Sequence, residues 1–312
     1  MRPKAGHGEV GPRATAPGRA AALHAAPPRH AAALPHAPPP AAALGPALPP
    51  WGKLTGMIIL FFADVIGKPG RDALIKKLPL LKERYGADAV VVNGENATDG
   101  KGIKPAHAEA LLSAGVDVIT TGNHIWKHRD TYRYLDEQPR VIRPFNFLGS
   151  SPGRGVTVVD TRAGRLGVVN LSGQLYLYPA RSPFEVVGEA LEQLHGVRNV
   201  LVDLHAEATS EKVAMGWHLD GQVSALVGTH THVRTGDAHI LPGGTAYMTD
   251  VGMCGPRDSV IGVKKELVLE RFLTQLPVRF EVADGDVWLE GVVIELGEDG
   301  RALRIEPFEE PA

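Results

Sequence analysis

The chain contains five short apolar runs, and each of them stops at a cluster of polar side chains. Between the runs lie stretches with helical periodicity, a pattern typical of buried strands and helices that alternate in an open α/β sheet. Binding sites in such sheets lie at the carboxyl ends of the strands. We therefore expect the five polar ends to lie close together, at Asp64, Asn93–Asn96, Asn123–His124, His205 and Gly228–His232.

Helices are predicted between and after these runs from the spacing of apolar positions. Ser182 is the expected N-cap of one helix, and Gly115 is the expected stop of another. Pro79 lies inside the first helix, where we expect a kink or a break. The predicted helices cover residues 71–85, 104–114, 128–137, 182–195, 209–218 and 263–275.

Two further pairs of strands are predicted from alternating apolar residues that flank turn residues. With the helices, they favour the α/β fold class. The expected architecture is a four-layer α/β/β/α sandwich of two mixed sheets, formed by residues 57–312 as one domain. The pairs are residues 155–160 with 166–170, and residues 280–282 with 287–294.

The first 56 residues differ from the rest in composition, since they hold 12 of the 25 prolines, long alanine stretches and a single acidic residue, Glu9. Such a segment offers little for a core, and its prolines interrupt helices. We expect residues 1–56 to be disordered, or to be a mis-annotated extension with Met57 as the true start. The alternative is an organelle transit peptide, since those leaders are also poor in acidic residues.

Charge and hydropathy exclude several classes of protein. The net charge is −2 and the first 56 residues are basic, so the remainder is acidic, which argues against stable nucleic-acid binding. No apolar run approaches the ~20 residues of a membrane span. Cys254 is the single cysteine, so no intrachain disulfide can form. A cytoplasmic location fits these features, and a homo-oligomer is compatible with them.

The polar ends carry carboxylate, carboxamide and imidazole groups without thiolate, a set that suits two ions of iron, manganese or zinc. Glu95 is the expected bridge, because a carboxylate has two oxygens. His230 and His232 would share one face of a continuing strand. The other expected ligands are Asp64, Asn96 and His232 for the first ion, and Asn123, His205 and His230 for the second.

Two metal ions about 3.5–4 Å apart can hold a hydroxide that attacks phosphorus in line with the leaving oxygen. His124 follows a ligand in sequence without being needed as one, and we assign it as the general acid. Glu207 could orient a ligand histidine or be a charge at a helix N-terminus. Trp126 could stack on a nucleobase, although core packing is the favoured interpretation.

These residues resemble the calcineurin-like metallophosphoesterases. Gly122-Asn123-His124 and Gly228-Thr229-His230-Thr231-His232 match two motifs of that superfamily closely. Its Asp-x-His motif is absent, since Val65 and Ile66 follow Asp64, and the acidic motif reads Asn93-Gly94-Glu95-Asn96. Both departures are similar to the bacterial YmdB-type branch. The resemblance implies cyclic-nucleotide phosphodiesterase activity, iron or manganese at both sites, and His124 as proton donor.

Our leading hypothesis is therefore a dinuclear metal-dependent phosphodiesterase that hydrolyses 2′,3′-cyclic nucleotides, with 3′,5′-cyclic nucleotides as a further candidate substrate. One alternative is a phosphomonoesterase or protein phosphatase on the same centre. Another is a regulatory metalloprotein that binds a nucleotide or a partner without turnover. The sequence leaves the metal and the physiological substrate open.

Overall fold

Residues 56–177 and 181–312 are described in the computed structural model, and the first of their two sheets is built around β1. Within this sheet β1, β2 and β3 are parallel, while β11 runs antiparallel to β1 and is flanked by β10 and β12. The strands are β1 (Met57–Phe62), β2 (Ala89–Asn93), β3 (Val118–Thr120), β10 (Cys254–Pro256), β11 (Val287–Leu296) and β12 (Ala302–Pro311).

The second sheet has the order β4-β5-β6-β7-β9-β8. Its four central strands are parallel, and an antiparallel strand closes each edge. Both sheets are therefore mixed, as predicted. The strands are β4 (Val156–Thr161), β5 (Gly164–Ser172), β6 (Asn199–His205), β7 (Ala225–Thr229), β8 (His239–Ile240) and β9 (Ala246–Met248).

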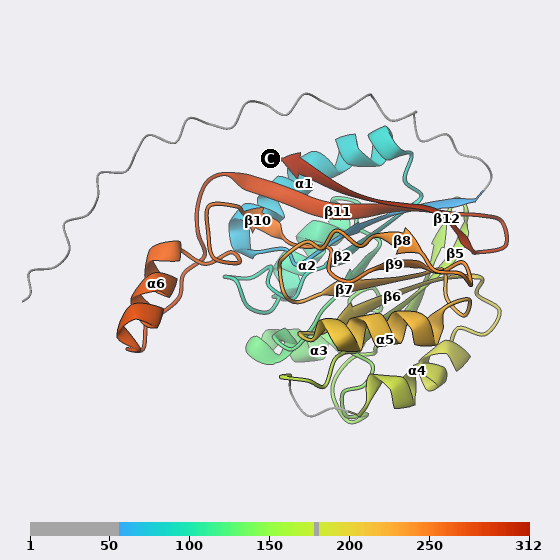
Figure 1. The fold of residues 1–312 in the computed structure, drawn as a ribbon, viewed down its shortest axis with the longest axis horizontal. Coiled ribbons are helices and arrows are strands. Elements are labelled where there is room, and N and C mark those ends of the chain that lie inside the picture. Colours follow the sequence, from blue (N-terminus) through green and yellow to red (C-terminus); the bar gives the residue numbers. More distant parts are fainter. Residues whose placement is uncertain (1–55, 178–180) are drawn as a thin grey trace, which may run out of the picture. The chain divides into compact units, whose positions relative to one another are not determined.

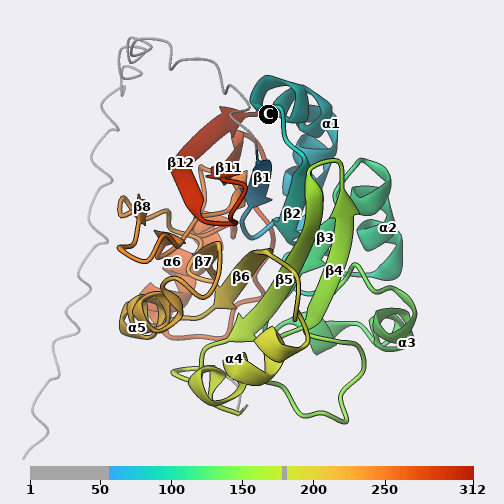
Figure 2. The same cartoon turned by 90° about the vertical axis from the view of Figure 1, so that its right-hand side faces the viewer.

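The two sheets stack face to face, with helices on their outer faces (Figures 1 and 2). Strand β1 shows how the layers are formed, because all six of its residues are buried and successive side chains point to opposite faces. Ile58 and Leu60 pack towards Leu74 of the outer helix, whereas Ile59 packs towards Val168 of the other sheet. A third core lies between the second sheet and its helices. The predicted four-layer α/β/β/α architecture is confirmed.

The helices cover the outer faces of both sheets, and most lie close to the predicted positions. α1 and α2 lie on the first sheet, while α4 and α5 lie on the second (Figures 1 and 2). Ser182 occupies the N-cap position of α4, although its side chain makes no capping hydrogen bond. The bounds are α1 (Gly67–Tyr85), α2 (Pro105–Ser113), α3 (Asp130–Glu137), α4 (Pro183–Glu192), α5 (Thr209–Leu219) and α6 (Lys265–Thr274).

Two expectations about individual elements differ from the structure. Of the kink or break expected at Pro79, a break does not occur, because α1 begins at Gly67 and continues to Tyr85, with Leu74, Leu78 and Leu81 on both sides of the proline buried in the core. Residues 280–282 form no strand with β11. Val282 instead makes a bridge to Val263, and the antiparallel partner of β11 is β12.

Strand β12 was missed because it contains Pro307 and Pro311 and alternates with charged residues. An edge strand tolerates proline, since one side of it makes no ladder hydrogen bonds, and β12 pairs with β11 alone. The predicted N-terminal segment, residues 1–56, lies outside the described residues apart from Gly56. Among the described helices, none has the length and apolar character needed to cross a bilayer.

Candidate metal centre

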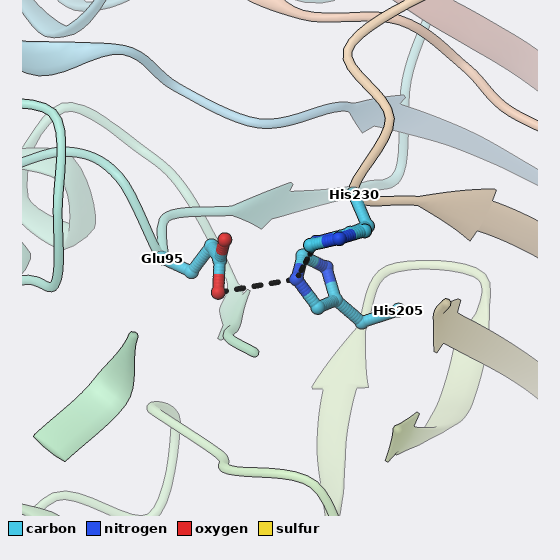
Figure 3. A group of neighbouring side chains, drawn as sticks. All are labelled: Glu95, His205 and His230. Atoms are coloured by element: carbon cyan, nitrogen blue, oxygen red, sulfur yellow. Dashed lines mark hydrogen bonds and ion pairs between the residues drawn. The ribbon is translucent and has the colours of Figure 1, made fainter. Parts of the chain in front are cut away.

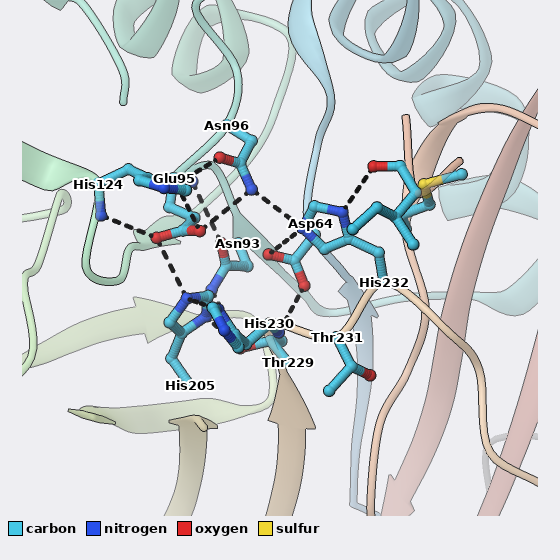
Figure 4. Close-up of polar contacts among 12 residues, drawn as sticks. Asp64, Asn93, Glu95, Asn96, His124, His205, Thr229, His230, Thr231 and His232 are labelled. Carbon is cyan, nitrogen blue, oxygen red and sulfur yellow. Dashed lines mark hydrogen bonds and ion pairs between the residues drawn. The ribbon is translucent and has the colours of Figure 1, made fainter. Parts of the chain in front are cut away.

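The five polar strand ends predicted from sequence converge at one place, where the carboxyl ends of strands from both sheets meet (Figure 4). In the first sheet, β1, β2 and β3 lead into the segments that carry Asp64, Glu95 and Asn123. In the second sheet, His205 ends β6 and His230 follows β7. Asp64, Glu95 and His205 are completely buried, so their polar atoms need partners within the site.

The first group of potential ligands contains Glu95, His205 and His230, whose donor atoms all lie within 4.8 Å of one another (Figure 3). Nε2 of His205 lies 3.1 Å from Oε2 of Glu95 and 3.1 Å from Nδ1 of His230. It is also 3.1 Å from Oδ1 of Asn123. A ring nitrogen carries at most one proton and cannot satisfy three such contacts as hydrogen bonds. Donor atoms that crowd in this way suit a shared cation.

The second group contains Asp64, Glu95 and His232. Oδ2 of Asp64 accepts a hydrogen bond from the backbone N–H of His230 at 2.9 Å. Oδ1 of Asp64 is buried without a hydrogen-bond partner and lies 3.6 Å from Nε2 of His232. An unpartnered buried carboxylate oxygen is costly unless a cation balances it, so this group also fits a metal ion. Glu95 belongs to both groups, as a bridging ligand must.

The two asparagines bring their amides to these groups. Oδ1 of Asn123 faces His205, as described above. Nδ2 of Asn96 lies 3.1 Å from Oε1 of Glu95 and 3.1 Å from Nε2 of His232, while its Oδ1 lies 2.9 Å from Nδ1 of His124. A half-turn of the Asn96 amide would present its oxygen, the atom that can bind a metal ion, to the second group.

His124 lies at the margin of the site and belongs to neither ligand group. Its side chain is 30% exposed, whereas that of Glu95 is fully buried. Its backbone N–H donates to Oε2 of Glu95 at 3.2 Å, and its Nδ1 lies 3.2 Å from Oε1. The residue therefore touches the shared carboxylate while its ring reaches the solvent side, where a substrate would enter.

Charges within the site balance each other. Burial raises the pKa of Glu95, but the charge of His205 and hydrogen bonds from His124 and His205 outweigh it, so the pKa lies well below its usual value. Burial lowers the pKa of His232, yet the Asp64 carboxylate raises it to about 9. Burial and repulsion by His205 lower the pKa of His230 to about 3. Burial also raises the pKa of Asp64, but the charges of His232 and His205 and a hydrogen bond from His232 together outweigh it, so this pKa is lowered too. The site therefore favours the ionised form of both carboxylates, the form that binds metal.

The loop from His230 to His232 does not continue strand β7, so the expectation that both rings share one face was wrong. His230 and His232 have φ angles of 100° and 62°, which turn the two rings towards different ligand groups. Asp250 holds this loop, because its Oδ2 accepts hydrogen bonds from the backbone N–H and the hydroxyl of Thr231. The same oxygen pairs with Lys212 at 2.7 Å, and this ion pair is buried.

A buried carboxylate that the sequence analysis did not identify, Asp203, is hydrogen-bonded to residues next to the ligand groups. Asp203 of β6 accepts hydrogen bonds from Asn93, Thr120 and Thr229 at the ends of three neighbouring strands. Burial raises the pKa of Asp203 to about 6, although His205 and these hydrogen bonds lower it. Oγ1 of Thr229 also lies 2.9 Å from Nδ1 of His205. The relay from His205 through Thr229 to Asp203 leaves Nε2 of His205 free to face the ligand group.

Close packing explains why residue 122 is a glycine. A Cβ atom at Gly122 would lie 2.3 Å from both Glu95 and His205, so only glycine fits between these side chains.

Glu207 and Trp126 each had two possible roles in the sequence analysis, and their contacts favour one of them. Oε2 of Glu207 lies 3.1 Å from Nε2 of His230, while Nδ1 of the same ring faces the ligand group, so Glu207 is placed to orient this histidine. The Trp126 ring packs against Tyr132 and Phe147, in agreement with a core role.

Comparison with known proteins identifies the family. A family model described as "YmdB-like protein" matches residues 60–308. The chain belongs to the YmdB-like family. This confirms the resemblance seen in the motifs. A relative from Bacillus subtilis (strain 168), named 2′,3′-cyclic-nucleotide 2′-phosphodiesterase, is 46% identical over 255 residues, which cover 80% of this chain and 96% of the relative.

Solved structures of similar sequence have the same fold. A structure described as a novel phosphatase from Mycoplasma pneumoniae is 37% identical, with a TM-score of 0.78, and the match covers 82% of this chain and 94% of that one. A hypothetical protein from Thermus thermophilus is 41% identical, with a TM-score of 0.77, and the match covers 82% of this chain and 99% of that one. Both matches support a metallophosphoesterase-type fold for the YmdB-like chain.

Proposed function

We propose that this YmdB-like protein is a metal-dependent phosphodiesterase that uses two divalent ions to hydrolyse cyclic nucleotides. The observation that carries the proposal is that two groups of donor atoms share the Glu95 carboxylate. The name of the Bacillus relative supports a 2′,3′-cyclic nucleotide as substrate. Activity on 3′,5′-cyclic nucleotides is part of the same proposal.

In this proposal the Glu95 carboxylate would help to hold both ions. Asp64, Asn96 and His232 would complete the ligand set of one ion, and Asn123, His205 and His230 would complete that of the other. These oxygen and nitrogen donors suit iron or manganese, with zinc as a further candidate. When bound, such a pair of ions supplies an activated water as nucleophile and neutralises charge on the phosphoryl oxygens.

The chain's own residues orient the substrate and move the proton. His124 lies on the solvent side of Glu95, where its ring can protonate the leaving oxygen of the ester. Its contacts with Glu95 and with Asn96 fix the ring beside the ligand groups. The cyclic diester opens when the P–O bond to this oxygen breaks, and the product is a nucleoside monophosphate.

Removal of metal provides the direct test of the proposed function. We expect a chelator to reduce hydrolysis of 2′,3′-cyclic AMP to background and added Mn²⁺ or Fe²⁺ to restore it. The diester should be hydrolysed faster than the corresponding monoester. If the protein hydrolyses no phosphate ester with any of these ions or with Zn²⁺, the proposal is wrong. In that case, calorimetry that shows binding of the nucleotide without formation of product would favour the regulatory alternative.

A phosphomonoesterase is the second candidate, because the matching Mycoplasma structure is described as a phosphatase. A preference for monoesters in the same assay would favour it over the diesterase. Both candidate functions would use the same ligand groups and the same proton donor, His124. They differ in whether the phosphate that is hydrolysed carries one ester bond or two.

Asp203→Asn should weaken Mn²⁺ binding by about 10–100-fold, the usual effect of losing a group that orients a metal ligand. The amide keeps the side-chain volume but cannot accept all the hydrogen bonds from Asn93, Thr120 and Thr229. Titration calorimetry would measure the affinity. Asp160→Asn, at an exposed position of β4, is the matched control and should bind Mn²⁺ like the unaltered protein. Equal affinities would contradict this role of Asp203.

A further inference from the structure

A cavity of about 500 Å³ opens directly beside the candidate metal centre. Its inner end is formed by Asn96, His124 and His232, which belong to the site described above. Its walls come from the loop after β2, from residues 260–263, and from α6 with the segment that follows it. A phosphate held at the centre would therefore lie at the mouth of this cavity, with the rest of the substrate free to enter it.

The walls of the cavity are predominantly apolar and include two aromatic rings. Phe272 on α6 is 77% exposed and Phe280 is 39% exposed, so most of the first side chain and part of the second are accessible to a ligand. α6 itself is weakly packed, since Val268 is its one buried residue (Figure 1). Exposed apolar surface that gathers in one place marks interaction or ligand-binding sites, and a cavity of this volume is typical of small-molecule sites.

Resting on the proposed function, we propose that this cavity binds the base of the nucleotide. Phe272 and Phe280 supply the aromatic surface for the ring. The guanidinium of Arg271 lies 5.4 Å from the centre of the Phe280 ring and adds a cation at the rim. Stacking on aromatic side chains tolerates every base, because each has a π-face. The site therefore favours nucleotides as a class over base-free diesters.

A second hollow beside His232 has a different character. It measures about 300 Å³ and contains Trp288, but Arg257 covers that ring at 3.7 Å from its centre. Arg257 is also paired with Glu309 at 2.7 Å. The Trp288 face is already covered at close range, whereas Arg271 lies farther from the Phe280 ring, at 5.4 Å, and the Phe272 side chain is 77% exposed. This contrast assigns the base to the cavity beside α6.

The experiment compares two cyclic diesters that differ in whether they carry a base. 2′,3′-cyclic AMP has the base, and glycerol 1,2-cyclic phosphate has the same five-membered ring without one. Phe272→Ala and Phe280→Ala should each lower kcat/KM for 2′,3′-cyclic AMP by about five- to 100-fold, as expected for loss of base stacking. The same variants should leave kcat/KM for glycerol 1,2-cyclic phosphate unchanged.

Leu273→Ala is the matched control, because Leu273 neighbours Phe272 on α6, is 82% exposed and does not line the cavity. It should not alter either rate. If the phenylalanine variants hydrolyse both diesters like the unaltered protein, the base site is wrong while the proposed function stands. If both rates fall together and sedimentation shows a changed assembly, α6 serves subunit packing and the base site is again wrong. If the unaltered protein hydrolyses neither diester, the proposed function itself fails.

Discussion

Glu95→Gln should lower turnover of a cyclic nucleotide by about 10³-fold, because two or more factors of ten in rate depend on the metal ions that this carboxylate would hold. Glu95 belongs to both ligand groups, so the loss of its charge weakens both ion sites together. Metal ions contribute several kcal/mol to stabilisation of the transition state, and about 1.36 kcal/mol corresponds to a factor of ten in rate. Glutamine keeps the shape of the side chain, so the effect reports on charge and ligation.

Elemental analysis of the purified variant would measure its metal content beside its activity. We expect Glu95→Gln to retain less than one equivalent of metal and the unaltered protein to hold two. Glu83→Gln, at an exposed position of α1, makes the same chemical change away from the site and should behave like the unaltered protein. Full metal content and activity in Glu95→Gln would remove Glu95 from the centre.

His124→Ala should reduce kcat by about 10²–10⁴-fold while both metal ions stay bound, because a general acid contributes that much to a rate. His124 contacts Glu95 and Asn96 but lies outside both ligand groups, so metal binding should survive its removal. A general acid matters most when the leaving oxygen is a poor leaving group. The deficit should therefore be large for an alkyl ester and small for a p-nitrophenyl ester.

A comparison of the two leaving groups shows whether His124 donates a proton or binds a metal ion. Equal deficits for alkyl and p-nitrophenyl diesters, together with loss of metal, would make His124 a ligand. His195→Ala serves as the control, since His195 is exposed and precedes the amino end of β6, whereas His205 lies at the carboxyl end of that strand. It should not change the rate with either ester.

Much of the fold could be predicted because its central strands are short apolar runs with clear ends. β1, β2, β6 and β7 are buried along their whole length and lie between helices with plain periodicity. The C-terminal hairpin was harder to predict. The pattern of β12 reflects an edge strand with one neighbour, and its pairing with β11 depends on contacts that local sequence does not encode.

The residues of the candidate site also differ in how well the sequence predicts them. Its ligand groups could be predicted because each donor follows an apolar run, and convergence at the carboxyl ends of strands is a property of the fold class. Its supporting residues could not, since their partners lie on other strands. Asp203 did leave a signal, because it interrupts the apolar run of β6 with a charge. The separation of His230 from His232 depends on backbone angles that the strand pattern does not reveal.

The place of β1 in its sheet bears on how the centre assembles. β1 pairs with β11, and the partners Met57 and Leu296 come from opposite ends of the described chain. Contacts between such distant segments close large loops, and a fold rich in them forms slowly. Asp64 follows β1 directly, so its position depends on the pairing of β1 with β2 and with the distant β11. The candidate metal centre is therefore tied to a contact between segments more than two hundred residues apart, and loss of the C-terminal hairpin should disturb metal binding as well as the fold.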